Sequence, residues 1–477
     1  MNIKISEIVA ATGGRLLNED TGEVATSVST DTRTIEIGAL FVPIAGPSFD
    51  GHDYIGAAAE KGAICALTER QNAPTDMDIP LIYVGSTRRA LLDLAHFYRM
   101  KHDVKVVAIA GSAGKTTTKD MIAEVLSQRF KTKRTIKNFN NAIGMPLSVF
   151  RAAPGDEVLV LEMGMNHAGE VRELSLAAAP DIAVITNIGD EHMENFQNRE
   201  GVLHANLEIA DGLREGGTII LNGDDPLLTS EIAARKVAAF VAHYPGEKNI
   251  RLSAPGARQE TRCKFHWRGA DIDITVPVPG AHMVQNALLA TVVGLEMGVT
   301  PAEIARAFEN FKPPEGRLNI FHTRGMTVID DVYNANPASV SEAIKVLCGN
   351  EGRRVAILGD MNELGNIAEA RHREIGEFAA QNGVDLLIAI GELSRYIYEG
   401  FARAGGNGTG IHFETAADFA PDEFLKNGDT VLVKASRGME FEKIVAKIKS
   451  APSARWAPGT CVESGTFPRS REQFPRP

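Results

Sequence analysis

The chain has 477 residues, of which 44% are hydrophobic and 23% are charged, and its formal net charge is −11. This length predicts about three domains, and the acidic balance argues against an extended nucleic-acid-binding surface. The spacing of the four cysteines is not that of a metal site, so we expect them to be reduced thiols. The sequence has neither a signal-peptide core nor a run of about 18 apolar residues. We therefore expect a cytoplasmic protein with no transmembrane segment and no nucleic-acid partner.

In chain order, residues 1–84 hold short strands and turns followed by a helical pattern at 53–61, which predicts a small α/β domain. Residues 85–313 alternate apolar strands with amphipathic helices, and this rhythm predicts a parallel sheet that binds ligands at the carboxyl ends of its strands. The strands of that sheet are expected at 104–110, 157–162, 181–188 and 218–222.

A Pro-Pro pair at 313–314 indicates a linker, and the α/β rhythm resumes beyond it. Residues 314–450 predict a second, smaller doubly wound sheet. Its strands are expected at 327–329, 354–358, 385–390 and 430–433. Residues 451–477 are rich in Pro, Ser, Gly and Arg without periodicity, so we expect a disordered tail.

A glycine-bounded loop follows the apolar run 104–110 and leads into helical sequence. Its spacing, Gly111-x-x-Gly114-Lys115-Thr116, is a short variant of the phosphate-binding loop. Glycines let backbone N–H groups surround phosphate oxygens, and the helix that follows presents its positive end. Lys115 would reach the β- and γ-phosphates, and Thr116 would hold Mg²⁺. The loop predicts a user of nucleoside triphosphates rather than a plain glycine-rich turn.

Polar side chains also follow other predicted strands. Glu162 ends an apolar strand, as a Mg²⁺ ligand opposite a phosphate loop would, although a solvated strand-end carboxylate has the same pattern. His192 could ligate a metal or orient a phosphate, or be structural. The asparagines at 138, 140 and 141 are, by themselves, typical of an ordinary turn.

Several longer runs extend these observations over nearly all of residues 1–450. In order they are GSAGKTTT at 111–118, NFNNAIGMP at 138–146, LEMG at 161–164, GAHMVQNAL at 280–288, GRL at 316–318, DDVYNANP at 330–337, and LGDMNELG at 358–365 with His372. Together they resemble the Mur ligase family. The runs at 330–337 and 358–365 are similar to the branch of that family that adds D-alanyl-D-alanine.

The resemblance implies three domains: an N-terminal one for the UDP end of the substrate, a central ATPase and a closing C-terminal one. It implies an ADP-forming ligation of D-alanyl-D-alanine to UDP-N-acetylmuramoyl-tripeptide in peptidoglycan precursor synthesis, with ATP and Mg²⁺. ATP would convert the tripeptide carboxylate to an acyl phosphate, which the dipeptide amine attacks. Because a carboxylate and a triphosphate repel each other, cations must neutralise the developing charge.

The resemblance also assigns site residues. Catalysis falls to Lys115, Glu162 and His192, and the metal to Thr116, Glu162 and His192. The ATP contacts are Gly111, Ser112, Ala113, Gly114, Lys115, Thr116, Thr117, Asn286, Arg317 and Asp331. The substrate contacts are Ser29, Asp31, Arg33, Asn334, Asn336, Ser436 and Arg437. Turn and helix-cap chemistry remains the alternative for each substrate contact in the C-terminal part.

One departure falls on the chemistry. Asn206 stands where the family has a lysine that CO₂ carbamylates to help hold a second Mg²⁺, and a neutral amide cannot supply that charge. We therefore expect weaker second-metal binding and slower acyl-phosphate formation. This leaves open a Mur-like protein that binds nucleotide sugar but ligates poorly. A different P-loop enzyme, such as a folate-polyglutamate-type ligase or a switch NTPase, is disfavoured by the runs at 330–337 and 358–365.

Overall fold

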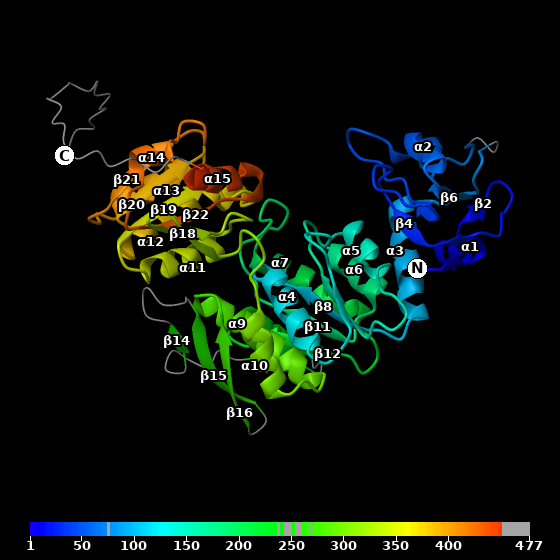
Figure 1. The fold of residues 1–477 in the computed structure, drawn as a ribbon, viewed down its shortest axis with the longest axis horizontal. Helices are drawn as coiled ribbons and strands as arrows, with labels where there is room; N and C mark the ends of the chain where they lie inside the picture. Colours follow the sequence, from blue (N-terminus) through cyan, green and yellow to red (C-terminus); the bar gives the residue numbers. More distant parts are fainter. Residues whose placement is uncertain (74–76, 236–238, 243–249, 253–259, 268–269, 451–477) are drawn as a thin grey trace.

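The structure is a computed structural model that describes residues 1–73, 77–235, 239–242, 250–252, 260–267 and 270–450. Three α/β parts follow one another along the molecule, with the N-terminal part at one end and the C-terminal part at the other (Figure 1). None of the described helices is long and apolar enough to cross a bilayer. The tail expected at 451–477 lies outside the described residues.

The N-terminal part is built on a five-stranded sheet in the order β2-β7-β6-β5-β4. Its last four strands pair in parallel, and β2 pairs antiparallel with β7. The strands are β2 (Arg15–Leu16), β4 (Ser27–Ser29), β5 (Ala39–Phe41), β6 (Ala63–Thr68) and β7 (Leu81–Tyr83), and a separate pair joins β1 (Ile3–Lys4) to β3 (Val24–Ala25). The helices are α1 (Ile5–Thr12), η1 (Gly51–Tyr54) and α2 (Ile55–Glu60), so the helical pattern at 53–61 is present.

Helix α3 (Thr87–Lys101) joins the first two parts. The Ser86 hydroxyl accepts a hydrogen bond from the N–H of Arg89 and so caps its start. The helix buries its apolar face against α1 on one side and α6 (Glu170–Ala178) on the other. Its residues share one hydrophobic core with strands of both sheets. The boundaries expected after residues 84 and 313 remain predictions.

The central sheet is six-stranded and wholly parallel, in the order β13-β12-β11-β8-β10-β9. The strands expected from the apolar runs are all present, and two shorter edge strands add to them. The strands are β8 (Lys105–Ala110), β9 (Thr132–Arg134), β10 (Val158–Glu162), β11 (Ile182–Ile185), β12 (Thr218–Asn222) and β13 (Ala239–Ala242). Strands β8, β10 and β11 are apolar and buried, as a sheet covered on both faces requires.

Helices cover both faces of the central sheet. They are α4 (Lys115–Leu126), α5 (Gly144–Val149), α6, α7 (Arg199–Leu207), η2 (Glu208–Gly212), α8 (Pro226–Arg235), α9 (Ala281–Glu296) and α10 (Pro301–Asn310). An antiparallel sheet of β14 (Ile250–Leu252), β15 (Thr261–Trp267) and β16 (Ala270–Val276) lies beside α9 and α10. This sheet is not among the elements expected from the sequence, because polar and charged residues interrupt its strands and leave no continuous apolar run.

The C-terminal part is a second six-stranded sheet, in the order β17-β18-β22-β19-β20-β21. Only β17 is antiparallel to its neighbour. The strands are β17 (Asn319–Thr323), β18 (Met326–Asp330), β19 (Arg353–Gly359), β20 (Leu386–Ile390), β21 (Thr409–Phe413) and β22 (Asp429–Lys434). The helices are α11 (Pro337–Cys348), η4 (Gly365–Ile367), α12 (Ala368–Gln381), α13 (Ser394–Arg403), α14 (Pro421–Phe424), η5 (Arg437–Met439) and α15 (Glu442–Ser450).

One hydrophobic core runs from the central sheet through α4, α9 and α10 to the inner face of the C-terminal sheet and α11. The carboxyl ends of both parallel sheets therefore lie on either side of a shared cleft, and this placement positions the site.

Candidate active site

A cavity of about 870 Å³ lies between the central and C-terminal parts. The central part contributes the phosphate loop, the ends of β10 and β11 and the start of α9. The C-terminal part contributes the segment after β18 and the loop after β19. Because both walls carry polar side chains at strand ends, this cavity is the candidate site.

The phosphate loop needs glycine at both ends. Gly111 has φ 127° and Gly114 has φ 81°, and both values favour glycine. A Cβ at Gly111 would lie 2.1 Å from the Thr186 hydroxyl oxygen, and one at Gly114 would lie 2.6 Å from Asn286 Oδ1. Asn286, an expected ATP contact, therefore packs directly against the loop.

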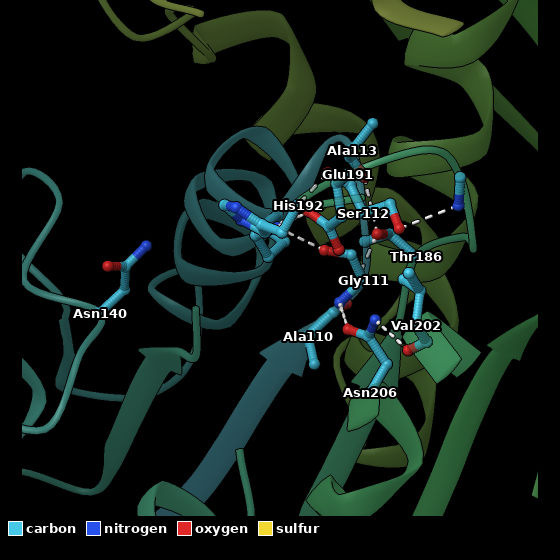
Figure 2. Close-up of polar contacts among 12 residues, drawn as sticks. Ala110, Gly111, Ser112, Ala113, Asn140, Thr186, Glu191, His192, Val202 and Asn206 are labelled. Atoms are coloured by element: carbon cyan, nitrogen blue, oxygen red, sulfur yellow. Dashed lines mark hydrogen bonds and ion pairs between the residues drawn. The ribbon is translucent and has the colours of Figure 1, made fainter. Parts of the chain in front are cut away.

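The segment after β11 holds the loop in shape. The N–H of Ser112 donates to the carbonyl of Asn187 at 2.8 Å, and the N–H of Ala113 donates to Asn187 Oδ1 at 2.9 Å. The Thr186 hydroxyl donates to the Ala113 carbonyl at 2.7 Å (Figure 2). The N–H of Gly189 donates to the Ser112 hydroxyl oxygen at 2.9 Å. Two strand ends thus fix the loop before any phosphate arrives.

Lys115 begins α4 directly after the loop. Its Nζ donates to the Gly111 carbonyl at 2.5 Å and to Glu191 Oε2 at 3.1 Å. The side chains of Lys115 and Glu191 are 17% and 8% exposed. The lysine expected to hold phosphate is therefore paired with a buried carboxylate that the sequence analysis did not single out.

Thr116 and Glu162, two expected metal ligands, are in contact. The Thr116 hydroxyl donates to Glu162 Oε1 at 3.2 Å, and Asn140 Nδ2 donates to the same oxygen at 2.9 Å. Glu162 Oε2 is buried without a hydrogen bond. Arg317 Nη2 lies 3.3 Å from the Thr116 hydroxyl and so brings a cation from the C-terminal part. Lys119 Nζ lies 3.9 Å from Glu162 Oε2. A hydroxyl beside a carboxylate oxygen that has no hydrogen bond suits a hard cation such as Mg²⁺.

His192, the third expected metal ligand, also lines the cavity. Its Nδ1 lies 2.8 Å from Glu363 Oε2, across the boundary between the two parts. His192 and Glu363 both have left-handed backbones, with φ 50° and 68°, and such strain is common at functional sites. The His192 imidazole helps to hold Glu363 ionised and lowers the pKa of that carboxyl. Within the described residues, no three acidic, His or Cys side chains form a metal cluster.

Asp331 and Arg317, two further expected ATP contacts, line the cavity. Asp331 Oδ2 accepts from the buried Lys434 at 2.6 Å, and Asp331 Oδ1 accepts from the N–H of Leu318 at 3.1 Å. Burial lowers the pKa of Lys434, and the Asp331 carboxylate opposes that shift. The Arg317 guanidinium stacks over the Tyr333 ring at 4.1 Å. These contacts order the segment after β18.

The four expected substrate contacts of the C-terminal part lie close together. Asn334 Oδ1 accepts from the N–H of Arg437 at 3.3 Å, and the Ser436 hydroxyl oxygen accepts from the N–H of Asn362 at 2.8 Å. Asn336 Oδ1 accepts from the N–H of Ser339 at 2.9 Å and caps α11. Asn334, Asn336 and Arg437 line the cavity, whereas Ser436 supports it from behind.

The expected substrate contacts of the N-terminal part lie outside this cavity. They follow β4, where the N–H of Asp31 donates to the Ser29 hydroxyl oxygen at 3.2 Å. Arg33 donates to both oxygens of Asp31, with Nη2 at 2.7 Å. This guanidinium lowers the pKa of Asp31 to about 2. A substrate contacting both regions would have to extend from one part of the molecule to the next.

Asn206 lies on α7 and is buried, with 2% of its surface exposed. Its Oδ1 accepts from the N–H of Gly111 at 2.7 Å, and its Nδ2 donates to the Val202 carbonyl at 2.9 Å (Figure 2). The amide oxygen that could have faced a metal is therefore used to hold the first glycine of the phosphate loop.

Three residues of the site escaped the sequence analysis. Glu191 pairs with Lys115, Asn187 braces the loop, and Glu363 meets His192. Glu191 and Asn187 belong to the Asn-Ile-Gly-Asp-Glu-His run after β11, so a strand-end signal was present. Glu363 lies in the run at 358–365, but its partner is 171 positions away in sequence, and no local pattern gives that pairing.

Comparison with known proteins agrees with this architecture. Family models match in three places: the Mur ligase family catalytic domain over residues 24–99, the Mur ligase middle domain over 109–294, and the Mur ligase glutamate ligase domain over 316–437. The three matched regions follow the order of the three parts of the structure.

Whole-chain relatives carry the comparison further. UDP-N-acetylmuramoyl-tripeptide–D-alanyl-D-alanine ligase of Bacillus subtilis is 36% identical over 94% of this chain and 98% of its own length. A crystal structure of MurF from Acinetobacter baumannii is 29% identical, with a TM-score of 0.86 over 94% of this chain and 99% of that one. MurF from Thermotoga maritima in complex with ADP is 27% identical, with a TM-score of 0.78 over 89% and 97%. The chain belongs to the Mur ligase family, and the expected three-domain α/β fold is confirmed.

Proposed function

We propose that this protein joins D-alanyl-D-alanine to UDP-N-acetylmuramoyl-tripeptide, with conversion of ATP to ADP and phosphate, in peptidoglycan precursor synthesis. The observation that carries the proposal is the cavity between two sheets, with a phosphate loop on one wall and the segment after β18 on the other. The Bacillus subtilis relative described above is named as the ligase of this pair of substrates. The relatives give no support to the alternative of a poorly ligating relic.

The reaction proceeds in two steps. An oxygen of the tripeptide carboxylate attacks the γ-phosphorus of ATP, the bond to the β-phosphate oxygen breaks, and ADP leaves. The amine of D-alanyl-D-alanine then attacks the acyl carbon, phosphate leaves, and the amine loses a proton. Lys115 and Arg317 are the cations of the cavity suited to the charge that develops during phosphoryl transfer.

The residues of the central wall also suit Mg²⁺. Thr116 and Glu162 would hold the ion through a hydroxyl and a carboxylate oxygen. Glu162 Oε2 has no hydrogen bond, and the nearest cation to it is Lys119 at 3.9 Å. His192 lines the same cavity and is the third candidate ligand. A bound Mg²⁺ would neutralise phosphate charge and orient the γ-phosphoryl group.

Residues of the C-terminal part are proposed to bind D-alanyl-D-alanine, the substrate that supplies the amine. Asn334 and Arg437 line the wall opposite the phosphate loop, where they could bind the peptide ends of the two substrates. The Ser29, Asp31 and Arg33 group is proposed to bind the nucleotide-sugar end, because an arginine suits a phosphate or a polar uracil.

A phosphate-release assay with each substrate omitted in turn tests the proposal. Phosphate should appear only when ATP, the UDP-linked tripeptide and D-alanyl-D-alanine are all present. Phosphate release from ATP when both the tripeptide and D-alanyl-D-alanine are absent would indicate a plain NTPase. Binding of the nucleotide sugar without turnover would indicate the relic.

A further inference from the structure

Glu191 lines the cavity, and one of its carboxylate oxygens has no hydrogen-bond partner. The side chain is 8% exposed, and its Oε2 receives Lys115 at 3.1 Å. Its Oε1 is buried and has no hydrogen-bond partner. A buried carboxylate oxygen without a partner carries a large desolvation cost, so its retention calls for a reason.

The position of Glu191 relates it to the phosphate-binding residues. Glu191 contacts Lys115, and Glu162 contacts the next residue, Thr116. Both carboxylates line the same cavity, and each keeps one buried oxygen free of hydrogen bonds. The start of α4 is thus flanked by two half-satisfied carboxylates, which are the oxygen ligands that a hard divalent cation prefers.

Asn206 supplies no anionic oxygen, and its buried Oδ1 is held by the N–H of Gly111 at 2.7 Å. Lys115 cannot keep its full ion pair with Glu191 while it also binds the phosphates of a triphosphate. When phosphate oxygens attract Lys115, the Glu191 carboxylate loses its cation and needs another.

We propose that Glu191 is an anionic ligand for the divalent cation that accompanies the triphosphate, and that Lys115 neutralises Glu191 until the nucleotide arrives. When the nucleotide binds, Lys115 moves from Glu191 to the phosphates and the divalent cation takes its place. The buried charge of Glu191 is therefore compensated before and after nucleotide binding. This inference rests on the proposed use of ATP with Mg²⁺.

The variant Glu191→Gln separates this role from a structural one because it affects two affinities in opposite directions. Mn²⁺ binding in the presence of a non-hydrolysable ATP analogue, followed by electron paramagnetic resonance, should weaken at least about tenfold, since even outer partners of metal ligands typically contribute that much. Binding of ADP in EDTA should tighten at least about twofold, since Lys115 no longer has a competing carboxylate.

Glu194→Gln is the matched control, because Glu194 is an exposed acid three residues further along the same segment. It should change neither affinity. Glu191→Asp keeps the charge and should recover part of the Mn²⁺ affinity, and the thermal midpoint of each variant without nucleotide reports on folding.

Unchanged Mn²⁺ affinity in Glu191→Gln would overturn the inference. Weakening of both Mn²⁺ and metal-free ADP binding would overturn it too, because that result describes a damaged loop. Wild-type protein that binds the ATP analogue with Mn²⁺ in either case leaves the proposed function standing. Wild-type protein that binds no nucleotide at all would instead refute the proposed function and this inference together.

Discussion

At the scale of single residues, Asn206 shows how a structure changes the meaning of a substitution. From the sequence alone, Asn206 indicates the loss of a metal-binding group. In the structure its amide holds the N–H of Gly111 at 2.7 Å and donates to the Val202 carbonyl at 2.9 Å. The residue therefore has a positive role in shaping the phosphate loop.

We predict that Asn206→Lys lowers stability and does not raise the ligation rate in bicarbonate. An ammonium accepts no hydrogen bond, so the buried Gly111 N–H loses its partner at a cost of about 1–3 kcal/mol. Thermal unfolding and phosphate release with and without bicarbonate measure both effects. Asn195→Lys makes the same change at an exposed position in the preceding segment and should be nearly neutral. A faster rate in bicarbonate would restore the interpretation of Asn206 as a lost metal ligand.

How far the sequence predicts the site depends on whether a residue's partner is local. Gly111, Gly114 and Lys115 could be assigned to a phosphate-binding loop because the residues of that motif are neighbours in the sequence. The contact between Lys115 and Glu191 joins two strand ends 76 positions apart. Periodicity and motif spacing report what one segment can form, but they do not report which side chain it will face.

At the scale of elements, α11 and α10 both begin with a capped Pro-containing turn. Asn336 caps α11 and Thr300 caps α10, each by accepting a hydrogen bond from the N–H three residues on. Asn336 also lines the cavity, whereas Thr300 does not. The pair can therefore separate helix capping from substrate binding.

Asn336→Ala and Thr300→Ala should each lower stability by about 0.5–2 kcal/mol, because each leaves a helix N–H without its cap. Only Asn336→Ala should also raise the KM for a peptide substrate if the proposed contact exists. Denaturant unfolding and steady-state kinetics on both variants decide this. Equal kinetics in the two variants would reduce Asn336 to a cap.

Helix α12 depends on a histidine that must stay neutral. His372 is fully buried; its Nε2 accepts from the N–H of Met361 at 2.9 Å and its Nδ1 faces the Ala368 carbonyl at 2.7 Å. Burial lowers the pKa of His372 below its ordinary value of 6.5, although the Ala368 carbonyl and Asp360 oppose the shift. The imidazole joins the start of α12 to the loop after β19.

The unfolded chain therefore binds a proton at His372 more readily than the folded one. The stabilising effect is fully present above about pH 6.5, and it is lost as the pH falls below that value. We expect His372→Gln to flatten the drop in thermal midpoint between pH 7.5 and pH 5.5. His167→Gln, at an exposed histidine, should keep the wild-type slope. An unchanged slope in His372→Gln would place the acid sensitivity elsewhere.

The predictable elements were the buried ones. Strands β8, β10 and β11 read as continuous apolar runs because both faces of the central sheet are covered. The strands of the antiparallel sheet are less visible in the sequence. Thr261–Trp267, for example, alternates basic with apolar residues and so lacks the continuous apolar run expected of a buried parallel strand. Short edge strands such as Thr132–Arg134 carry too few apolar residues to stand out.

At the scale of the whole molecule, a small group of charges links the C-terminal part to the central part, beside the hydrophobic core that the two parts share. Asp190, whose side chain is 4% exposed, receives Arg199 of the central part at 2.6 Å and Arg371 of α12 at 2.9 Å. His192 and Glu363 form another link between the two parts, and His282 of α9 lies 3.5 Å from Glu342 of α11. Burial tends to raise the pKa of Asp190, but the two arginines more than offset this and lower it.

Because the proposed ATP contacts are divided between two parts, we expect the linker at residues 313–314 to act as a hinge during the cycle. Arg371→Gln should favour a more open arrangement of the two parts, since it removes one of the links across the boundary while Asp190 keeps Arg199. Small-angle scattering should then give a larger radius of gyration without ligand, and compaction with ATP analogue and tripeptide substrate should need higher ligand concentrations.

Arg373→Gln is the matched control for this prediction. Arg373 lies on the same helix but pairs with Glu369 and Glu399 within the C-terminal part. Its loss should leave the radius of gyration unchanged. In kinetics, Arg371→Gln should raise the KM values more than it lowers kcat, because closed enzyme, once formed, keeps its catalytic groups. If Arg371→Gln and Arg373→Gln gave the same scattering and the same KM values, the Asp190 group would not control closure, and the cavity would close through its substrates alone.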